Sequence, residues 1–132
     1  DVEHIGDNCK NIAEFAAEKT KNGYWFSDTA CAEIYQCFEY GTKMVANAIE
    51  ALKNTDFDIA KEIKAQEKEL NKLEADLRIK HMERLNRREC SPEFTVIYTD
   101  VVHNIEKIGD SCDNIANVVL DEVNTKKINA KE

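Results

Sequence analysis

Two short acidic patterns stand far apart in the sequence, and each has the spacing of a cation-binding helix face. Glu3 and Asp7 are four residues apart, and so are Glu106 and Asp110. On a helix, such a pair lies on one face with Cβ atoms about 6 Å apart. Two carboxylates this close repel each other, and a multivalent cation removes the repulsion. Because oxygen ligands at this spacing can bridge more than one ion, the patterns predict metal binding.

The two patterns belong to a longer repeat. Residues 1–14 read DVEHIGDNCKNIAE and residues 104–117 read NIEKIGDSCDNIAN, with eight of fourteen positions identical at a constant offset of 103. Helical periodicity requires no shared glycine, cysteine or asparagine, so this identity indicates a duplication. The chain would then hold one complete repeat and the closing helix of a preceding repeat.

A glycine precedes the aspartate in both copies, as Gly6 and Gly109. Glycine inside a helix costs about 1 kcal/mol relative to alanine. We therefore expect the close approach of a neighbouring helix, or a metal cluster, to offset that cost at each position. A solvated acidic face is the alternative interpretation, but it gives no reason for the shared glycine.

Further polar residues extend the second copy. A stripe of ligand-type side chains follows at steps of three and four residues: His103, Glu106, Asp110, Asp113 and Asn117. Asn11 and Asn114 recur in the repeat, and a buried hydrogen bond between helices explains them as well as a metal contact does. The histidines do not recur, so we interpret His4, His81 and His103 as surface or boundary residues.

Four helices must position these side chains. Apolar spacing predicts helices over about 2–21, from about 28 to 53, from about 56 to 89 and from 92 to about 123, followed by a polar tail over 124–132. Asn22 and Gly23 supply the first helix stop, an aromatic connection spans 24–26, and Ser27 or Asp28 caps the second helix. With one proline and four glycines in 132 residues, the chain is predicted to be an all-α antiparallel bundle of four helices.

Composition narrows the possible partners. The net charge of −8 repels a phosphate backbone, so nucleic acid is not an expected partner. Five cysteines without a CxxC pair indicate neither a disulfide framework nor a zinc site, which suggests a reducing compartment. No apolar run approaches the roughly 18 residues that a membrane-spanning helix needs, so we do not expect this piece to cross a membrane.

The segments EHIGDNCKNIAE and EKIGDSCDNIA resemble the glutamate-x-x-glycine-aspartate helices of the PhoU family. The resemblance implies two packed three-helix repeats whose acidic motifs hold multinuclear metal clusters. Residues 28–123 are similar to one complete repeat, and residues 1–21 resemble the closing helix of the other. The stretch from Arg84 to Leu120 is most similar to the PhoU-type domain at the cytoplasmic C-terminal end of bacterial sodium/phosphate cotransporters.

Carried over residue by residue, the resemblance places metal ligands at Glu3 and Asp7, and at Glu106 and Asp110. A further family motif falls on the third predicted helix, over residues 67–71, where Glu67 is followed by Asn71 in place of the terminal acid. An asparagine offers only a neutral carbonyl, so we expect a weaker or smaller cluster there. The implied ions are iron or zinc, with magnesium, manganese and calcium open.

The resemblance implies a regulatory, non-catalytic domain of a sodium-dependent phosphate transporter. Its expected partners are the transporter's own membrane domain or the phosphate-transport machinery, and a second copy in a homo-oligomer. Its expected location is the cytoplasmic face of the cell membrane. Three alternatives stay open: a free-standing PhoU-type regulator, a structural helical adaptor, and a ferritin-like di-metal carboxylate enzyme. The last would require Glu-x-x-His motifs on two helices.

Overall fold

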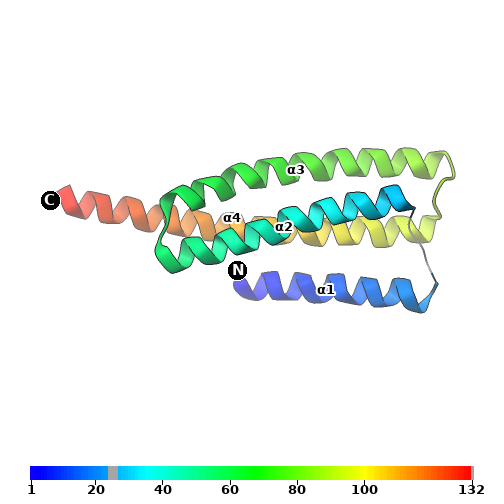
Figure 1. The fold of residues 1–132 in the computed structure, drawn as a ribbon, viewed down its shortest axis with the longest axis horizontal. Helices are drawn as coiled ribbons and strands as arrows, with labels where there is room; N and C mark the ends of the chain where they lie inside the picture. Colours follow the sequence, from blue (N-terminus) through cyan, green and yellow to red (C-terminus); the bar gives the residue numbers. More distant parts are fainter. Residues whose placement is uncertain (24–26, 132) are drawn as a thin grey trace.

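A computed structural model describes residues 1–23 and 27–131, which form a bundle of four helices (Figure 1). The helices are α1 (Val2–Lys21), α2 (Asp28–Asn54), α3 (Phe57–Asn86) and α4 (Pro92–Lys131). Successive helices alternate in direction, so α4 runs parallel to α2 and antiparallel to α1 and α3. The predicted all-α helical bundle is confirmed.

The helix starts follow from local capping chemistry. Ser27 caps α2, because its hydroxyl accepts a hydrogen bond of 3.2 Å from the amide of Ala30. Asp56 caps α3 in the same way, through a bond of 3.1 Å from the amide of Ile59. The aromatic connection predicted at 24–26 lies outside the described residues.

Two helix ends differ from the sequence-based boundaries. The third helix ends at Asn86, earlier than the predicted Glu89. Arg88 there adopts φ 59°, a left-handed conformation that a right-handed helix cannot continue. The fourth helix was expected to fray from about Asn124, but α4 continues to Lys131 and extends past the rest of the bundle (Figure 1).

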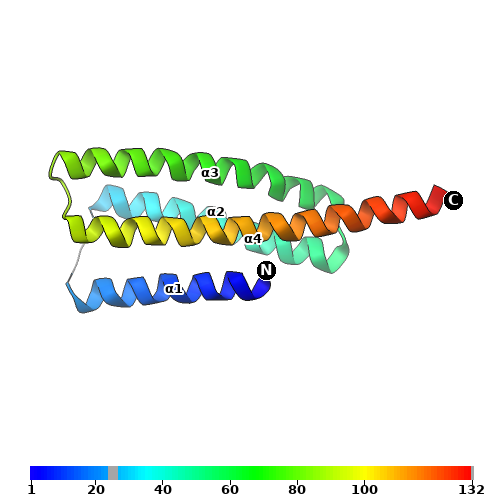
Figure 2. The ribbon, with the colours of Figure 1, turned by 180° about the vertical axis from the view of Figure 1, so that it is seen from behind.

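The helix α4 is the centre of the molecule. It packs against α1, α2 and α3, whereas α1 packs against α4 alone among the described helices. Figure 2 shows α4 lying between α1 and α3. The core is built largely from small and branched side chains at helical spacing, including Met44, Ala48, Ile63, Leu70, Leu77, Ile105, Cys112 and Val119. The arrangement is a three-helix unit with a fourth helix attached.

The contact between α1 and α4 is nearly symmetric. The amide of Asn11 donates to the side-chain oxygen of Asn104 at 3.1 Å, and the amide of Asn114 donates to Asp1 at 3.3 Å. At the repeat offset of 103, Asp1 corresponds to Asn104 and Asn11 corresponds to Asn114. The two hydrogen bonds are therefore one contact made twice, which relates the antiparallel helices by an approximate two-fold axis.

Candidate metal centre

Two glutamates of α3 are buried against the acidic side of α4. Glu67 and Glu74 stand seven residues apart, and their exposed fractions are 8% and 7%. A step of seven returns to the same helix face, so both point toward α4. The carboxyl group of Glu67 lies beside that of Asp110, and the carboxyl group of Glu74 lies beside that of Glu106. We call these four carboxyl groups the acidic seam.

At one end of the acidic seam, Glu67 and Asp110 lie within interaction distance. One oxygen of Glu67 accepts a hydrogen bond of 3.2 Å from the Asn71 amide. Its other oxygen, Oε2, is buried and receives no hydrogen bond from the described protein atoms. Burial and the neighbouring Asp110 carboxylate raise the pKa of Glu67. Since two carboxylates offer only acceptors, a shared proton or a bound cation must lie between them to join them.

The other end of the acidic seam adds a nitrogen donor. One ligand atom from each of Glu74, His103 and Glu106 lies within 4.8 Å of the others. Nδ1 of His103 is 3.5 Å from Oε2 of Glu106. Burial, with Glu106 as a hydrogen-bonding neighbour, raises the pKa of Glu74, although Arg78 pairs with it at 2.5 Å. Imidazole together with carboxylates suits zinc or iron more than magnesium, manganese or calcium.

Gly109 allows α4 to pack closely against α3 beside the acidic seam. A Cβ at this position would lie 2.7 Å from Cδ2 of Leu70 and 2.9 Å from Oε2 of Glu67. The expectation that a neighbouring helix explains the glycine is confirmed here. At Gly6, by contrast, no described atom lies within 4 Å of a built Cβ, so no described helix accounts for this glycine, and the metal-cluster alternative stays a prediction there.

The remaining predicted ligands are not members of the acidic seam, although the Asp113 carboxylate is near enough to help raise the pKa of Glu67. Glu3 and Asp7 are exposed on α1. Asp7 and Asp110 both line an open hollow of about 370 Å³ at the approximate two-fold axis between α1 and α4. Asp113 pairs with Lys64 at 2.9 Å, and the same ammonium donates to Asn117 at 2.9 Å. The asparagines Asn11 and Asn114 bond across the α1–α4 contact, but both side chains are exposed, so the burial that one of the two interpretations expected is not found.

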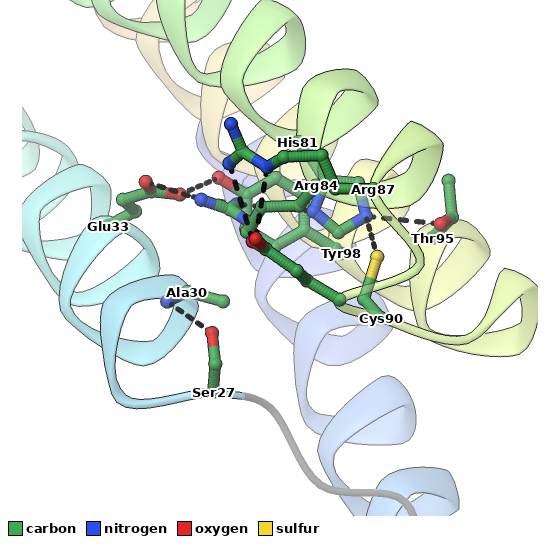
Figure 3. A network of polar contacts seen from close by, with 10 residues as sticks. Ser27, Ala30, Glu33, His81, Arg84, Arg87, Cys90, Thr95 and Tyr98 are labelled. Atoms are coloured by element: carbon green, nitrogen blue, oxygen red, sulfur yellow. Dashed lines mark hydrogen bonds and ion pairs between the residues drawn. The ribbon is translucent and has the colours of Figure 1, made fainter.

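Burial of His81 corrects its interpretation as a surface or boundary residue. Its exposed fraction is 3%, and its ring stacks on Tyr98 with centroids 4.1 Å apart. Nε2 lies 3.1 Å from the Thr95 hydroxyl, and Nδ1 lies 3.2 Å from Arg84 (Figure 3). Nothing in the repeat pointed to this position, because the first copy has no equivalent of α3.

His81 belongs to a polar network in which charge is balanced. Arg84 donates two hydrogen bonds to the Glu33 carboxylate, at 2.8 and 2.7 Å, and the Tyr98 hydroxyl donates a third at 2.8 Å (Figure 3). Burial acts to raise the pKa of Glu33, but these donors outweigh it and lower the pKa. A carboxylate that is already paired needs no metal, so we interpret this network as structural.

The sequence carried an overlooked signal for the missed residues. Glu67, Glu74 and His81 stand at steps of seven on α3, each buried, between the apolar residues that form its core face. Reading α3 for charged residues at core positions, instead of for one motif, would have found Glu74. His103 lies in the ligand-type stripe, but no histidine of the first copy of the repeat is equivalent to it, which favoured its interpretation as a surface residue.

Comparison with known proteins places the chain in context. The family described as "PhoU domain" matches residues 34–119. A phosphate-specific transport system accessory protein, PhoU homolog 1 of Thermotoga maritima, is 26% identical over 120 residues, which cover 91% of this chain and 51% of the relative. The chain thus spans about half the length of this curated relative. No solved structure matched the chain.

Proposed function

The chain belongs to the PhoU domain family, and from this premise we propose that it is a non-catalytic regulatory or accessory module of phosphate transport. The match over residues 34–119 carries the proposal, since it covers most of α2, all of α3 and the first part of α4. The similarity to the Thermotoga maritima relative, which is named as an accessory protein of phosphate-specific transport, supports it. Among the described residues, no helix has an apolar stretch long enough to cross a bilayer.

The regulatory role has a direct test in the organism that encodes the chain. Deleting the gene should change phosphate uptake or the response to phosphate starvation, and the intact gene should restore the wild-type response. Unchanged uptake and an unchanged starvation response across limiting and replete phosphate would refute the proposed role.

The acidic seam is the proposed metal site of this module. Glu67 and Asp110 supply oxygen ligands at one end, and Glu74, His103 and Glu106 supply a mixed set at the other. The buried Oε2 of Glu67, without a protein donor, supports this assignment because a cation would satisfy it. Bound metal would supply charge neutralisation between α3 and α4. Zinc or iron fits the mixed donor set best.

Metal binding is tested by melting temperature and elemental analysis. Chelator-stripped protein supplied with Zn²⁺ or Fe²⁺ should melt at a higher temperature and retain at least about one ion per chain. Glu67→Gln and Glu74→Gln should each reduce this gain. Asp76→Asn, at an exposed acid on α3, is the matched control and should keep it. Equal melting temperatures with and without metal, together with less than one ion per chain, would refute metal binding. The structural helical adaptor would then be the favoured interpretation.

The finer proposal is attachment to a sodium-dependent phosphate transporter, with the module at the cytoplasmic face of the membrane. The resemblance of residues 84–120 to cotransporter PhoU-type domains supports it. Reading the gene on both sides of residues 1–132 tests it. Repeated long apolar segments in the same reading frame are the expected result. A gene that encodes only soluble helical repeats would instead indicate a free-standing regulator.

The ferritin-like enzyme gains no support from the acidic seam. That class places a Glu-x-x-His pair on two helices. Among the described residues, α3 contributes Glu67 and Glu74 to the acidic seam but no histidine, because His81 contacts Thr95 and Arg84 instead.

A further inference from the structure

A cavity opens at the end of the bundle where α2 and α4 begin and α3 ends (Figure 2). Its volume is about 340 Å³, which is enough for a small ion or molecule. The helices α2, α3 and α4 and the turn between α3 and α4 contribute to its walls, whereas no described residue of α1 does. We call it the end cavity. Its polar wall residues include Ser27, His81, Arg84, Arg88, Glu89 and Ser91.

The end cavity carries an unbalanced positive charge in a chain whose net charge is −8. Arg84 pairs with Glu33 at 2.7 Å, and Arg87 pairs with Glu89 at 3.0 Å. Arg88 lines the cavity but takes part in none of the ion pairs of the described residues. Its guanidinium is therefore available to an anion.

One hydrogen-bond donor of the network beside the cavity also lacks an acceptor. Nε of Arg84 is buried and unpaired among the described atoms, while the two terminal nitrogens hold Glu33. The exposed fraction of Arg84 is 7%. Buried donors are almost always paired, so this one indicates a missing acceptor. The Ser27 hydroxyl accepts from Ala30 and keeps its own proton for donation.

Two helix starts add to the attraction for an anion. Ser27 caps α2, and Ser91 directly precedes α4, so the parallel helices both begin at the end cavity. A helix N-terminus carries a partial positive charge and unpaired amides. The acids of the two first turns, Asp28 and Glu93, offset part of this charge, but neither lines the cavity.

We propose that the end cavity binds inorganic phosphate in its hydrogen phosphate form. Arg88 supplies the cation, and the hydroxyls of Ser27 and Ser91 donate hydrogen bonds to phosphate oxygens. The choice of phosphate as the natural anion rests on the proposed function, whereas anion binding rests on the cavity.

Glu89 gives the end cavity its selectivity among oxyanions. Arg87 occupies one lone pair on each Glu89 oxygen, so the carboxylate can still accept the P–OH proton of hydrogen phosphate. Sulfate is fully ionised at neutral pH and has no such proton, so the carboxylate repels it.

Amide chemical shifts in a phosphate titration test the site. The protein is stripped of metal with a chelator and titrated at constant pH and ionic strength, so neither a metal in the acidic seam nor salt accounts for a response. We expect saturating shifts confined to residues 27–31 and 88–95, with a dissociation constant on the order of 1 mM or lower. Shifts that do not saturate, or that spread over the whole surface, would overturn the proposal.

Two variants with the same change in charge locate the site. Arg88→Gln should raise the dissociation constant about tenfold, because it removes the unpaired guanidinium and leaves Arg84 with Glu33. Lys72→Gln, at an exposed position on α3, is the matched control and should leave affinity within about twofold. Equal weakening by both variants would reduce the effect to nonspecific charge attraction and overturn the site.

Sulfate and glycerol 3-phosphate test the ligand itself. At pH 7.5 a phosphomonoester has largely lost its last proton, so both anions should bind about tenfold more weakly than phosphate. Glu89→Gln should let sulfate bind about as tightly as phosphate. Equal binding of sulfate, or of glycerol 3-phosphate, to the unmodified protein would overturn hydrogen phosphate as the ligand. These measurements use purified protein and the regulatory role is tested by gene deletion, so failure of one is distinguishable from failure of the other.

Discussion

The first and second copies of the repeat have nearly the same sequence but opposite surroundings. On α4, Gly109 lies against Leu70 and Glu67 of α3, and its neighbouring acids face buried glutamates. On α1, Gly6 has no described atom near its missing Cβ, and Glu3 is exposed. The motif by itself therefore does not make a site. An acidic helix becomes a candidate metal centre when a second helix brings further carboxylates against it.

The largest difference between the copies is expected from substituting each glycine with alanine. Gly109→Ala should destabilise the fold by about 2 kcal/mol, because the added methyl overlaps side chains that are almost fully buried. Gly6→Ala should stabilise it by about 1 kcal/mol, since alanine favours a helix and the space is open. Urea unfolding of both variants measures the two signs. Equal effects would mean that the copies share an environment after all.

The second difference concerns pH. The pKa of Glu67 is raised in the folded protein, so its contribution to stability is present below about pH 4 and is lost as pH rises through the folded value. In chelator, Glu67→Gln should therefore be more stable than wild type above neutral pH, by on the order of 1 kcal/mol.

The same measurement has an internal control. The pKa of Glu33 is lowered in the folded protein, so the stability that Glu33 contributes is lost as pH falls. Wild type and Glu67→Gln both carry Glu33, so this loss cancels in the difference between their stabilities. Glu3→Gln on exposed α1 is the matched variant of the first copy and should follow the wild-type profile. If Glu67→Gln tracked wild type from pH 5 to 9, Glu67 would not be the strained carboxyl of the acidic seam.

The smallest difference is expected at the two equivalent hydrogen bonds. Asn11→Ala should cost about 1 kcal/mol, because it removes the donor to Asn104, whose exposed fraction is 7%. Asn114→Ala should cost less than about 0.5 kcal/mol, because its partner Asp1 is exposed to water. Thermal unfolding of the two variants compares them. A larger loss at Asn114 would contradict the assigned burial.

The helices and their starts were predictable from sequence because they depend on local chemistry. Ser27 and Asp56 have short polar side chains that bond the first free amides of the following helix, and this requires no distant residue. The end of α4 was less predictable, since its polar residues after Asn124 carry no stop signal as strong as the glycine after α1. The predicted break there rested on composition alone.

The candidate site was predictable only in part. The spacing within each copy identified Glu106 and Asp110, and the resemblance added Glu67. Glu74 was missed because a glutamate at a core position looks like any other charged helical residue until its burial is known. The buried ion pair between Arg84 of α3 and Glu33 of α2 was equally hard to predict, because the two residues are 51 positions apart in the sequence.

Sequence alone determined the helical class, the repeated segment and the acids that stand one turn apart, because all three are properties of spacing along the chain. Tertiary packing decided which copy receives buried glutamates and which remains in water. The physical reason is that a carboxylate's solvation and its neighbouring charges depend on the helix packed against it, and α3 packs against α4 but not α1.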